Sequence, residues 1–360
     1  MENDLMTFAK RLQQARLKAR LSMEKLCEKM NGLVTKQAIS KYEKAKMMPS
    51  STILISLAEV LDCDIDYFFR PFTFELDQFK VSFRKKSDTT AGDQKALKVQ
   101  IQDEVERYLE IEDVLQLKPT ALLSEPLVPS QPLSSSSDMV EMAQKVREAW
   151  QLGNAPILNA MELLEAHGIK VLLTEAPEDF DGVSGIVNDI TPVIVLNSTN
   201  THIERRRLTS FHELSHLLFN DYFSTNLTEH QKENLCNAFA NEMLLPSAVL
   251  LSQFEEKKQI AYAELEALSV NYGISIDAII YKLKDLGIVG DKRYRAFCIQ
   301  KRKSPAFNEF IVKSRFTEKA TTRFKTMVYN ALVQELISTS KAASLLGESI
   351  NTVRKYANSL

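Results

Sequence analysis

The sequence predicts a mostly helical α+β protein with several domains. Its 360 residues are enough for two or three domains. Apolar residues recur at helical spacing along most of the chain, whereas strand-like runs are confined to 72–83 and 169–197. A Pro- and Ser-rich stretch at 118–138 is typical of an extended linker. We therefore expect an N-terminal five-helix bundle at 1–70, a bridge and linker at 71–137, a domain with a small β-sheet at 138–300 and a C-terminal helical domain at 301–360.

The composition is that of a globular protein in a reducing compartment. Hydrophobic residues make up 44% of the chain and charged residues 26%. The four cysteines form no CxxC pair, which argues against a disulfide framework and a cysteine-based zinc knuckle: Cys27, Cys63, Cys236 and Cys298. We see no signal peptide and no apolar run of about 18 residues, so we expect a cytoplasmic protein that does not enter a membrane.

The first 70 residues predict a helical bundle with a basic surface. The first 50 contain 11 Lys and Arg against 5 Asp and Glu, an excess that a nucleic-acid-binding module would show. Apolar spacing predicts a helix over about 5–20, and Ser22 and Thr35 can each cap a further helix. Another helix is expected after Pro49, and 65–69 closes the bundle.

Residues 34–44 read VTKQAISKYEK, and MPSS, ILISLA and LDCDIDYFF follow. This pattern resembles the Cro/cI-type (XRE) helix-turn-helix family over residues 6–70. The resemblance implies that the third helix enters the major groove of double-stranded DNA. Residues on that helix would then reach base edges or phosphates: Thr35, Lys36, Gln37, Ser40, Lys41 and Lys44. Ala45 departs from the family, which commonly has Gly there to end the helix. A protein-interaction bundle is the alternative.

The bridge at 71–137 combines two patterns. Residues 72–83 alternate as strands do, and Gln94–Leu117 predicts a long helix with a narrow apolar stripe. The charged remainder of this helix fits a solvated face, and a dimer-forming helix is the alternative.

The stretch from His212 to His216 carries the chemistry in the second half of the chain. Two histidines four residues apart on a helix point at one spot, as two ligands of a tetrahedral zinc site do. Histidine is scarce here, with 5 in 360 residues, which argues against a chance match. Glu213 stands beside the pair, where it can act as the catalytic base that takes a proton from water.

A third ligand is needed, and Glu233 on a downstream helix would complete a site of two His and one Glu. Its rivals are Glu229, His230 and Glu242. Asn237 follows Glu233 by one turn and can orient the first His through a hydrogen bond. The spacing does not choose which side chain stabilises the transition state; the candidates are Tyr222, His230 and His202.

The elements around this site follow from periodicity and turn signals. Helices are expected over 139–152, from Pro156 to Ala166, and over 261–268 and 275–286. Strands are expected over 169–173, 183–187 and 192–197, the last two forming a hairpin with Asn188-Asp189 in the turn. The second hairpin strand runs toward the metal helix, and we expect it to pair with extended substrate. We expect the three arginines at 205–207 to precede the metal helix and to be either salt-bridged or solvated.

Five stretches in this order resemble the ImmA/IrrE-type metallopeptidases over about residues 140–290: LNAMELLEAHGIKVLL, DGVSGI, VIVLN, RRRLTSFHELSHLLF and ENLCNAFANEMLLP. The resemblance implies a gluzincin-like zinc protease with Zn²⁺ as cofactor. Helix-turn-helix repressors are the implied substrates of several members, in phage, mobile-element or stress responses. Phe211 and Ser215 depart from the small residues that the family favours there, which could alter the cleft but leaves every metal ligand present.

The tail predicts a helix over 327–336, followed by a helix, a Gly turn at Gly347 and a helix ending in Thr-Val-Arg-Lys. This resembles a second helix-turn-helix unit. DNA contact and a packing or oligomer role are both open for it.

Together these patterns predict a DNA-binding transcriptional regulator that carries a zinc endopeptidase and cleaves a repressor. We expect a homodimer on an operator with two half-sites. One alternative is a non-catalytic repressor or antitoxin-like regulator in which zinc is structural. Another is a latent protease whose cleft is plugged by the 118–137 linker or the tail.

Overall fold

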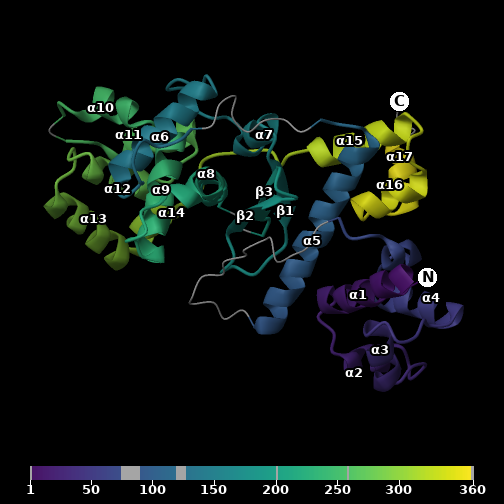
Figure 1. Cartoon of the computed structure of the whole chain (residues 1–360). Coiled ribbons are helices and arrows are strands. Elements are labelled where there is room, and N and C mark those ends of the chain that lie inside the picture. Colours follow the sequence, from purple (N-terminus) through teal and green to yellow (C-terminus); the bar gives the residue numbers. More distant parts are fainter. Residues whose placement is uncertain (1, 74–89, 119–126, 200–201, 258, 358–360) are drawn as a thin grey trace. The chain divides into compact units, whose positions relative to one another are not determined.

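The computed structural model describes residues 2–73, 90–118, 127–199, 202–257 and 259–357 (Figure 1). The chain forms two compact units. The first unit combines residues 1–118 with 322–360, and the second contains 119–321. The predicted C-terminal domain at 301–360 is therefore shared between them, and the boundaries between the four predicted regions stay predictions. The strands predicted at 72–83 lie almost entirely outside the described residues.

The N-terminal head of the first unit has five helices, the last of them a 3₁₀ helix: α1 (Glu2–Lys18), α2 (Met23–Lys29), α3 (Lys36–Glu43), α4 (Ser51–Val60) and η1 (Ile65–Phe69). Ser22 caps α2 and Thr35 caps α3, each accepting a hydrogen bond from a first-turn amide, as the sequence predicted. Apolar side chains from every helix fill the core, among them Phe8, Leu26, Ile39, Leu57 and Phe68.

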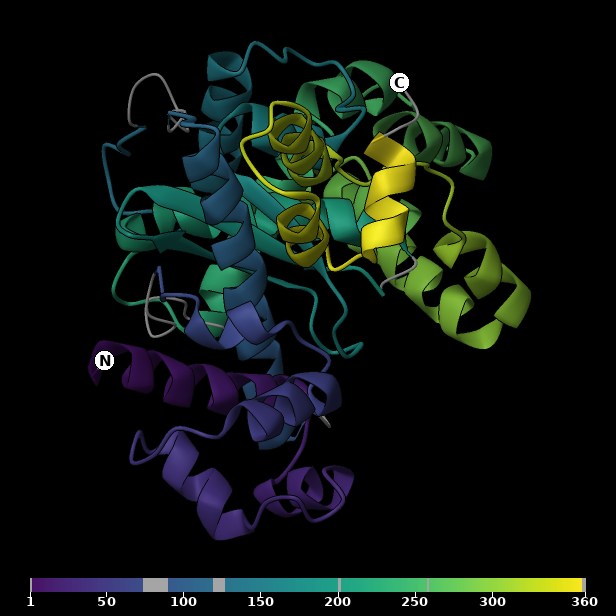
Figure 2. The same cartoon turned by 90° about the vertical axis from the view of Figure 1, so that its right-hand side faces the viewer.

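A long helix, α5 (Ala91–Val114), connects the head to three C-terminal helices in the same unit. These helices are α15 (Arg323–Val333), α16 (Thr339–Leu346) and α17 (Ile350–Ala357). Figure 2 shows α1 running across α5, and α15 packs on α5 through the stacked rings of Tyr108 and Phe324, 5.5 Å apart. The two ends of the chain therefore meet on one helix.

The second unit contains a three-stranded sheet of β1 (Lys170–Thr174), β2 (Gly182–Val187) and β3 (Thr191–Asn197). The strand order is β1-β3-β2, with β1 parallel and β2 antiparallel to β3. The predicted hairpin is confirmed, and Asn188 and Asp189 both adopt positive φ in its turn. Pairing of β3 with substrate was a wrong prediction, because β3 is the central strand and β2 is an edge strand.

Helices α7 (Ala160–Ala166) and α8 (Ile203–Phe219) pack on this sheet. The other helices of the unit are α6 (Ser136–Ala149), η3 (Asn220–Tyr222), α9 (Glu229–Leu244), α10 (Ser247–Phe254), α11 (Tyr262–Tyr272), α12 (Ile276–Asp285), α13 (Asp291–Lys303) and α14 (Pro305–Val312). Helix α7 begins later than predicted, because the Asn159 side chain caps it and Pro156–Leu158 stay outside. Among the described residues, no single helix is long and apolar enough to cross a membrane. Helices α9 and α10 together have the length and composition of such a span, but they are bent by 66° relative to each other.

The three arginines at 205–207 lie inside the first turns of α8, not before it. Arg205 pairs with Asp181, and the fully buried Arg207 pairs with Glu318 at 2.7 Å. Glu204 accepts hydrogen bonds from Ser314 and from the amide of Arg315. The start of α8 is therefore fixed by charged contacts with the 314–318 segment, as the salt-bridged alternative predicted.

Candidate metal centre and nucleic-acid interface

The candidate centre lies between α8 and α9, which pack along each other. Rings of Phe219 and Phe239 meet edge to face at 5.6 Å and help hold the two helices together. Thr228 and Gln231 form a capping box that starts α9. On its other side, α8 contacts β2 and β3. Gly182 permits this approach, since a Cβ there would lie 2.8 Å from the Thr209 side chain.

Three predicted ligands converge between these helices. The Nε2 atoms of His212 and His216 are 3.2 Å apart. Glu233 reaches both rings from α9, with one carboxylate oxygen 3.1 Å from Nε2 of His212 and the other 3.4 Å from Nε2 of His216. Three potential ligand atoms thus meet at one point, two from histidines four residues apart on α8 and one from Glu233 on α9.

The separations fit a tetrahedral zinc ion. Ligand atoms about 2.0–2.2 Å from zinc, at tetrahedral angles, are separated by roughly 3.3–3.5 Å. The three observed separations of 3.1, 3.2 and 3.4 Å lie close to that range. Glu233 is 49% exposed, so the site opens toward solvent at the carboxylate. The donor set and its spacing therefore suit a divalent ion with a further position open.

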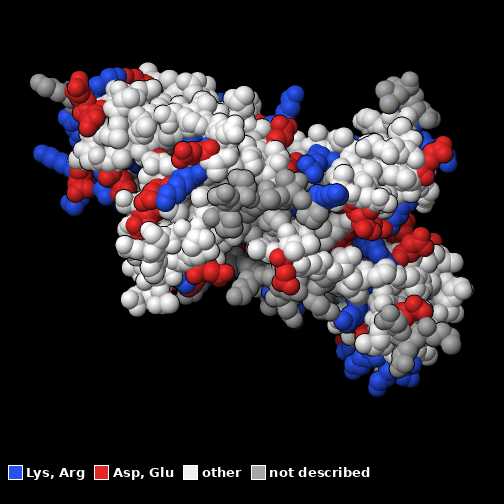
Figure 3. Space-filling view, turned by 45° about the horizontal axis from the view of Figure 1, so that its top comes forward, with Lys and Arg blue, Asp and Glu red and all other residues white. Residues whose placement is uncertain are grey.

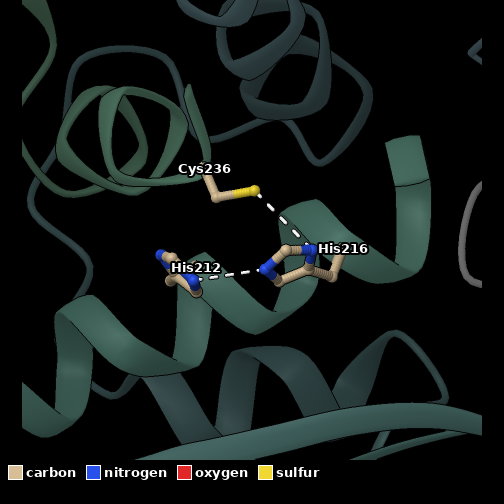
Figure 4. Close-up of side chains that lie close together, drawn as sticks. All are labelled: His212, His216 and Cys236. Atoms are coloured by element: carbon tan, nitrogen blue, oxygen red, sulfur yellow. Dashed lines mark hydrogen bonds between the residues drawn. The ribbon is translucent and has the colours of Figure 1, made fainter. Parts of the chain in front are cut away.

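The far nitrogens of both rings also have partners on α9. Nδ1 of His212 lies 3.0 Å from Oδ1 of Asn237, an acceptor, so in the neutral ring the proton lies on Nδ1 and the lone pair lies on Nε2, toward the site. Nδ1 of His216 lies 3.7 Å from Sγ of Cys236. Figure 4 shows the cysteine reaching His216 from the neighbouring helix while the two rings approach each other.

Cys236 is itself close enough to be considered as a ligand. Ligand atoms of His212, His216 and Cys236 all lie within 4.8 Å of one another. The Cys236 contact, however, uses Nδ1 of His216, whereas Nε2 of that ring faces His212 and Glu233. The carboxylate contacts both Nε2 atoms, whereas the thiol contacts only Nδ1 of His216, so the geometry favours Glu233 over Cys236 as a third ligand.

His216 and the Glu233 carboxylate stabilise each other's charged forms. Burial opposes a charge on His216, but hydrogen bonds to Cys236 and Glu233 outweigh it and raise the pKa of His216 to about 11. Hydrogen bonds from His212 and His216 hold the pKa of Glu233 well below its usual range. The carboxylate is therefore ionised near neutral pH, which is the form that binds a metal.

Glu213 lies next to His212 on α8, and its side chain is buried. The Ser184 hydroxyl of β2 donates a hydrogen bond of 2.7 Å to Oε2 of Glu213. One carboxylate oxygen is thus fixed by the sheet. Phe211 and Ser215, the two departures from the family pattern, are fully buried side chains of the same helix.

The rival ligands have other partners. Glu242 is fully buried and pairs with Lys282 at 2.5 Å, and it accepts hydrogen bonds from Ser247. Glu229 pairs with Lys232 on the surface. His230 contacts Asn234, one turn along α9. No contact found among the described residues joins His230 or Tyr222 to the centre, and the role of these two residues or of His202 at the transition state stays a prediction.

The third helix of the head presents the residues predicted to contact DNA. Five of them are exposed: Thr35, Lys36, Gln37, Lys41 and Lys44. Ser40 is half-buried. Ile39 and Tyr42 of the same helix are buried in the core. Exposed Lys25 and Lys29 of α2 add charge, and Figure 3 shows Lys and Arg gathered on the head at the lower right of that view. The basic excess predicted from the sequence is therefore on the surface.

Two family models match separate parts of the chain. Residues 12–68 match the model described as helix-turn-helix, and 164–284 match the peptidase M78 model, described as IrrE N-terminal-like domain. The chain joins a helix-turn-helix domain to an IrrE-like domain. The second match supports a metallopeptidase-like domain, and it includes every residue of the candidate centre. A search of curated proteins finds no match for the chain.

The sequence did not identify two residues of the centre, Ser184 and Cys236. Cys236 lies three residues after Glu233, so helical spacing on α9 could have placed it on the same face. Ser184 lies on a strand, and only the packing of β2 against α8 brings it to Glu213. No sequence spacing encodes that contact.

Proposed function

We propose that this chain is a DNA-binding regulator that carries a gluzincin-like zinc endopeptidase. The observation that supports this most strongly is the convergence of two imidazole Nε2 atoms and the Glu233 carboxylate next to Glu213. The two family matches support the pairing of a DNA-binding head with a peptidase-like domain.

His212, His216 and Glu233 would hold the zinc. When bound, zinc acts as a Lewis acid that polarises a peptide carbonyl and lowers the pKa of water. Glu213 would take the proton from the attacking water and later deliver it to the departing amine. Ser184 keeps the Glu213 carboxylate oriented, while Asn237 and Cys236 keep the imidazole rings in place.

Strand β2 offers a binding edge for an extended peptide. It pairs with β3 on one side, and no other described strand pairs with it. Its Ser184 reaches the proposed catalytic base, so the edge lies beside the site. A peptide added to this edge would be held by backbone hydrogen bonds, which suits a substrate recognised as an unfolded or looped segment. We propose a repressor as that substrate, in a phage, mobile-element or stress response.

Head residues Gln37 and Lys41 would read base edges from α3, in a homodimer that spans two half-sites of an operator. Lys36 also pairs with Glu24 in the free protein, so binding DNA at Lys36 would exchange one partner for another.

The test is metal analysis followed by cleavage. We expect one zinc per chain and site-specific cleavage, by mass spectrometry, of the helix-turn-helix repressor encoded beside this gene. A chelator should stop the reaction, and added zinc should restore it. Zinc-loaded protein that leaves every tested repressor intact would contradict the peptidase proposal.

The non-catalytic alternative requires a fourth protein ligand, and Cys236 is the candidate that the geometry offers. Cobalt substitution distinguishes the two cases, because a bound thiolate adds a sulfur-to-metal charge-transfer band. We expect no such band. Its appearance, and its loss in Cys236→Ala, would favour a closed structural site.

A further inference from the structure

The last two helices of the chain form a tight helix-turn-helix unit. Helix α16 ends at Leu346 and α17 begins at Ile350, so three residues separate them. Gly347 adopts φ +65°, which a residue with a side chain rarely adopts. The Ser349 hydroxyl accepts a hydrogen bond from the amide of Thr352 at 3.1 Å and so caps α17. Helix α15 packs on both of the others.

The second helix of this unit resembles α3 of the head at its cap and at three further positions, although Ile350 stands where α3 has Lys36. Thr35 caps α3, and Ser349 occupies the same place before α17. The fourth residue of each helix is buried: Ile39 in α3 and Val353 in α17. In the same alignment, solvent-facing residues of like chemistry coincide: Gln37 with Asn351 and Lys41 with Lys355, all exposed. Two of the polar positions that α3 would present to DNA thus recur on the exposed surface of α17.

Charge pairing singles out this face within the tail. Three of the cations in α15–α17 have acidic partners: Arg323 pairs with Glu112, Lys325 with Glu348 and Lys341 with Glu110. The other two, Arg354 and Lys355, are adjacent exposed residues of α17 with no ion-pair partner among the described residues. Helix α17 contains no acidic residue. A polyanion is therefore the complementary partner for this face.

Both helix-turn-helix units are anchored on α5. Lys18 and Arg107 both pair with Asp103, at 2.8 and 2.7 Å, so the head is tied to this helix. Arg107 also donates to the carbonyl of Leu345 in α16, at 3.2 Å. A single arginine thus contacts the residue that holds the head and the helix that precedes α17.

We propose that α15–α17 are a second DNA-binding unit, in which Asn351, Arg354 and Lys355 of α17 contact double-stranded DNA. The unit lies outside both family matches. This inference extends the proposed function, and it depends on that proposal only where α17 is compared with α3 as a DNA-binding helix. One chain would then contact two segments of duplex.

The experiment uses the full-length protein and a pool of 40-base-pair duplexes with a randomised centre. Sites are selected with the wild type, with Arg354→Ala/Lys355→Ala and with Gln37→Ala/Lys41→Ala. Affinity for the selected duplexes is then measured by fluorescence anisotropy across a salt series. Arg302→Ala/Lys303→Ala is the matched control, because it removes an equal exposed Arg-Lys pair from α13.

We expect each half-site selected by the wild type to contain two sequence elements, of which Arg354→Ala/Lys355→Ala retains one. If each side chain meets one phosphate, the salt slope falls by about 1.8, and the affinity loss between 50 and 200 mM salt becomes about 12-fold smaller. The control variant should match the wild type.

Three outcomes are decisive. Unchanged sites and salt slope in Arg354→Ala/Lys355→Ala overturn the inference and leave the role of α3 intact. A changed oligomeric state with unchanged DNA affinity assigns the surface to self-association and also overturns it. Binding that depends on α17 but persists in Gln37→Ala/Lys41→Ala supports the inference and contradicts the proposed role of α3.

Discussion

The two helix pairs that carry the proposed functions, α2–α3 and α8–α9, are built in opposite ways. In α3 the predicted contact residues face solvent, and only the core-facing residues are packed. In α8–α9 the working side chains face one another, and each ring has partners at both nitrogens. The exposed side chains of the first pair are free to contact another molecule, whereas contacts within the protein fix the geometry of the second pair.

This difference determines how each pair should respond to substitution. Surface side chains of α3 contribute little to the fold, so their loss should affect binding alone. Side chains of α8–α9 share one network, so losing one should weaken metal affinity through the others. Four substitutions test the contrast, beginning with the largest expected effect.

Glu213→Gln should abolish peptide cleavage while zinc content stays at the wild-type level. The amide keeps the shape of the side chain but cannot take a proton, and a positioned base contributes about 10²–10⁴-fold to rate. Single-turnover cleavage and metal analysis measure the two effects. Glu229→Gln, at the exposed first residue of α9, is the control and should cleave normally. Full activity in Glu213→Gln would eliminate Glu213 as the base.

Asp103→Asn should destabilise the first unit by about 3 kcal/mol, since the partly buried Arg70 and Arg107 lose the buried carboxylate that they share. Burial opposes ionisation of Asp103, but Arg107, Lys18 and Arg70 outweigh it and hold its pKa well below the usual range. The stabilisation is therefore complete above the usual Asp pKa of about 3.9 and declines as pH falls below it.

Urea denaturation followed by circular dichroism at several pH values should show the difference between wild type and Asp103→Asn shrinking as pH falls toward 3. Trp150, the single tryptophan, lies in the second unit, so its fluorescence is an internal control. A difference that grows toward acid pH would contradict this assignment of charge.

Asn237→Ala should weaken zinc affinity by about 10–100-fold, because His212 loses the acceptor that fixes its proton on Nδ1. Competition with a fluorescent chelator measures the affinity directly. Asn234→Ala, one turn from His230 on the same helix, should bind zinc as the wild type does. Equal affinities in both variants would mean that His212 needs no orienting partner.

Ala45→Gly should stabilise the head by about 0.5 kcal/mol. Ala45 has φ +53°, a left-handed conformation that costs an alanine about 1 kcal/mol, while glycine gains entropy in the unfolded chain. Ala38→Gly, inside α3, should instead destabilise by about 1 kcal/mol. Thermal melting compares the two, and shifts of the same sign would contradict the backbone argument.

The sequence predicted what depends on short spacing. The caps Ser22 and Thr35, the contact face of α3 and the pairing of His212 with His216 all follow from residues within a few positions of each other. Glu233, on a second helix, was chosen from rivals, and its contact with both rings favours that choice over Glu242, which Lys282 holds. Ser184 was missed because it meets Glu213 only through packing of a strand on a helix. The tail was predicted as helices, but its position against α5 required tertiary contacts such as Tyr108 with Phe324.

The union of both chain ends on α5 has a consequence during translation. Since domains generally fold as they emerge, the peptidase-like unit can be finished while α5 still lacks α15–α17. A chain that stopped before residue 322 would carry a folded peptidase-like unit while the apolar stripe of α5 stayed uncovered by α15–α17.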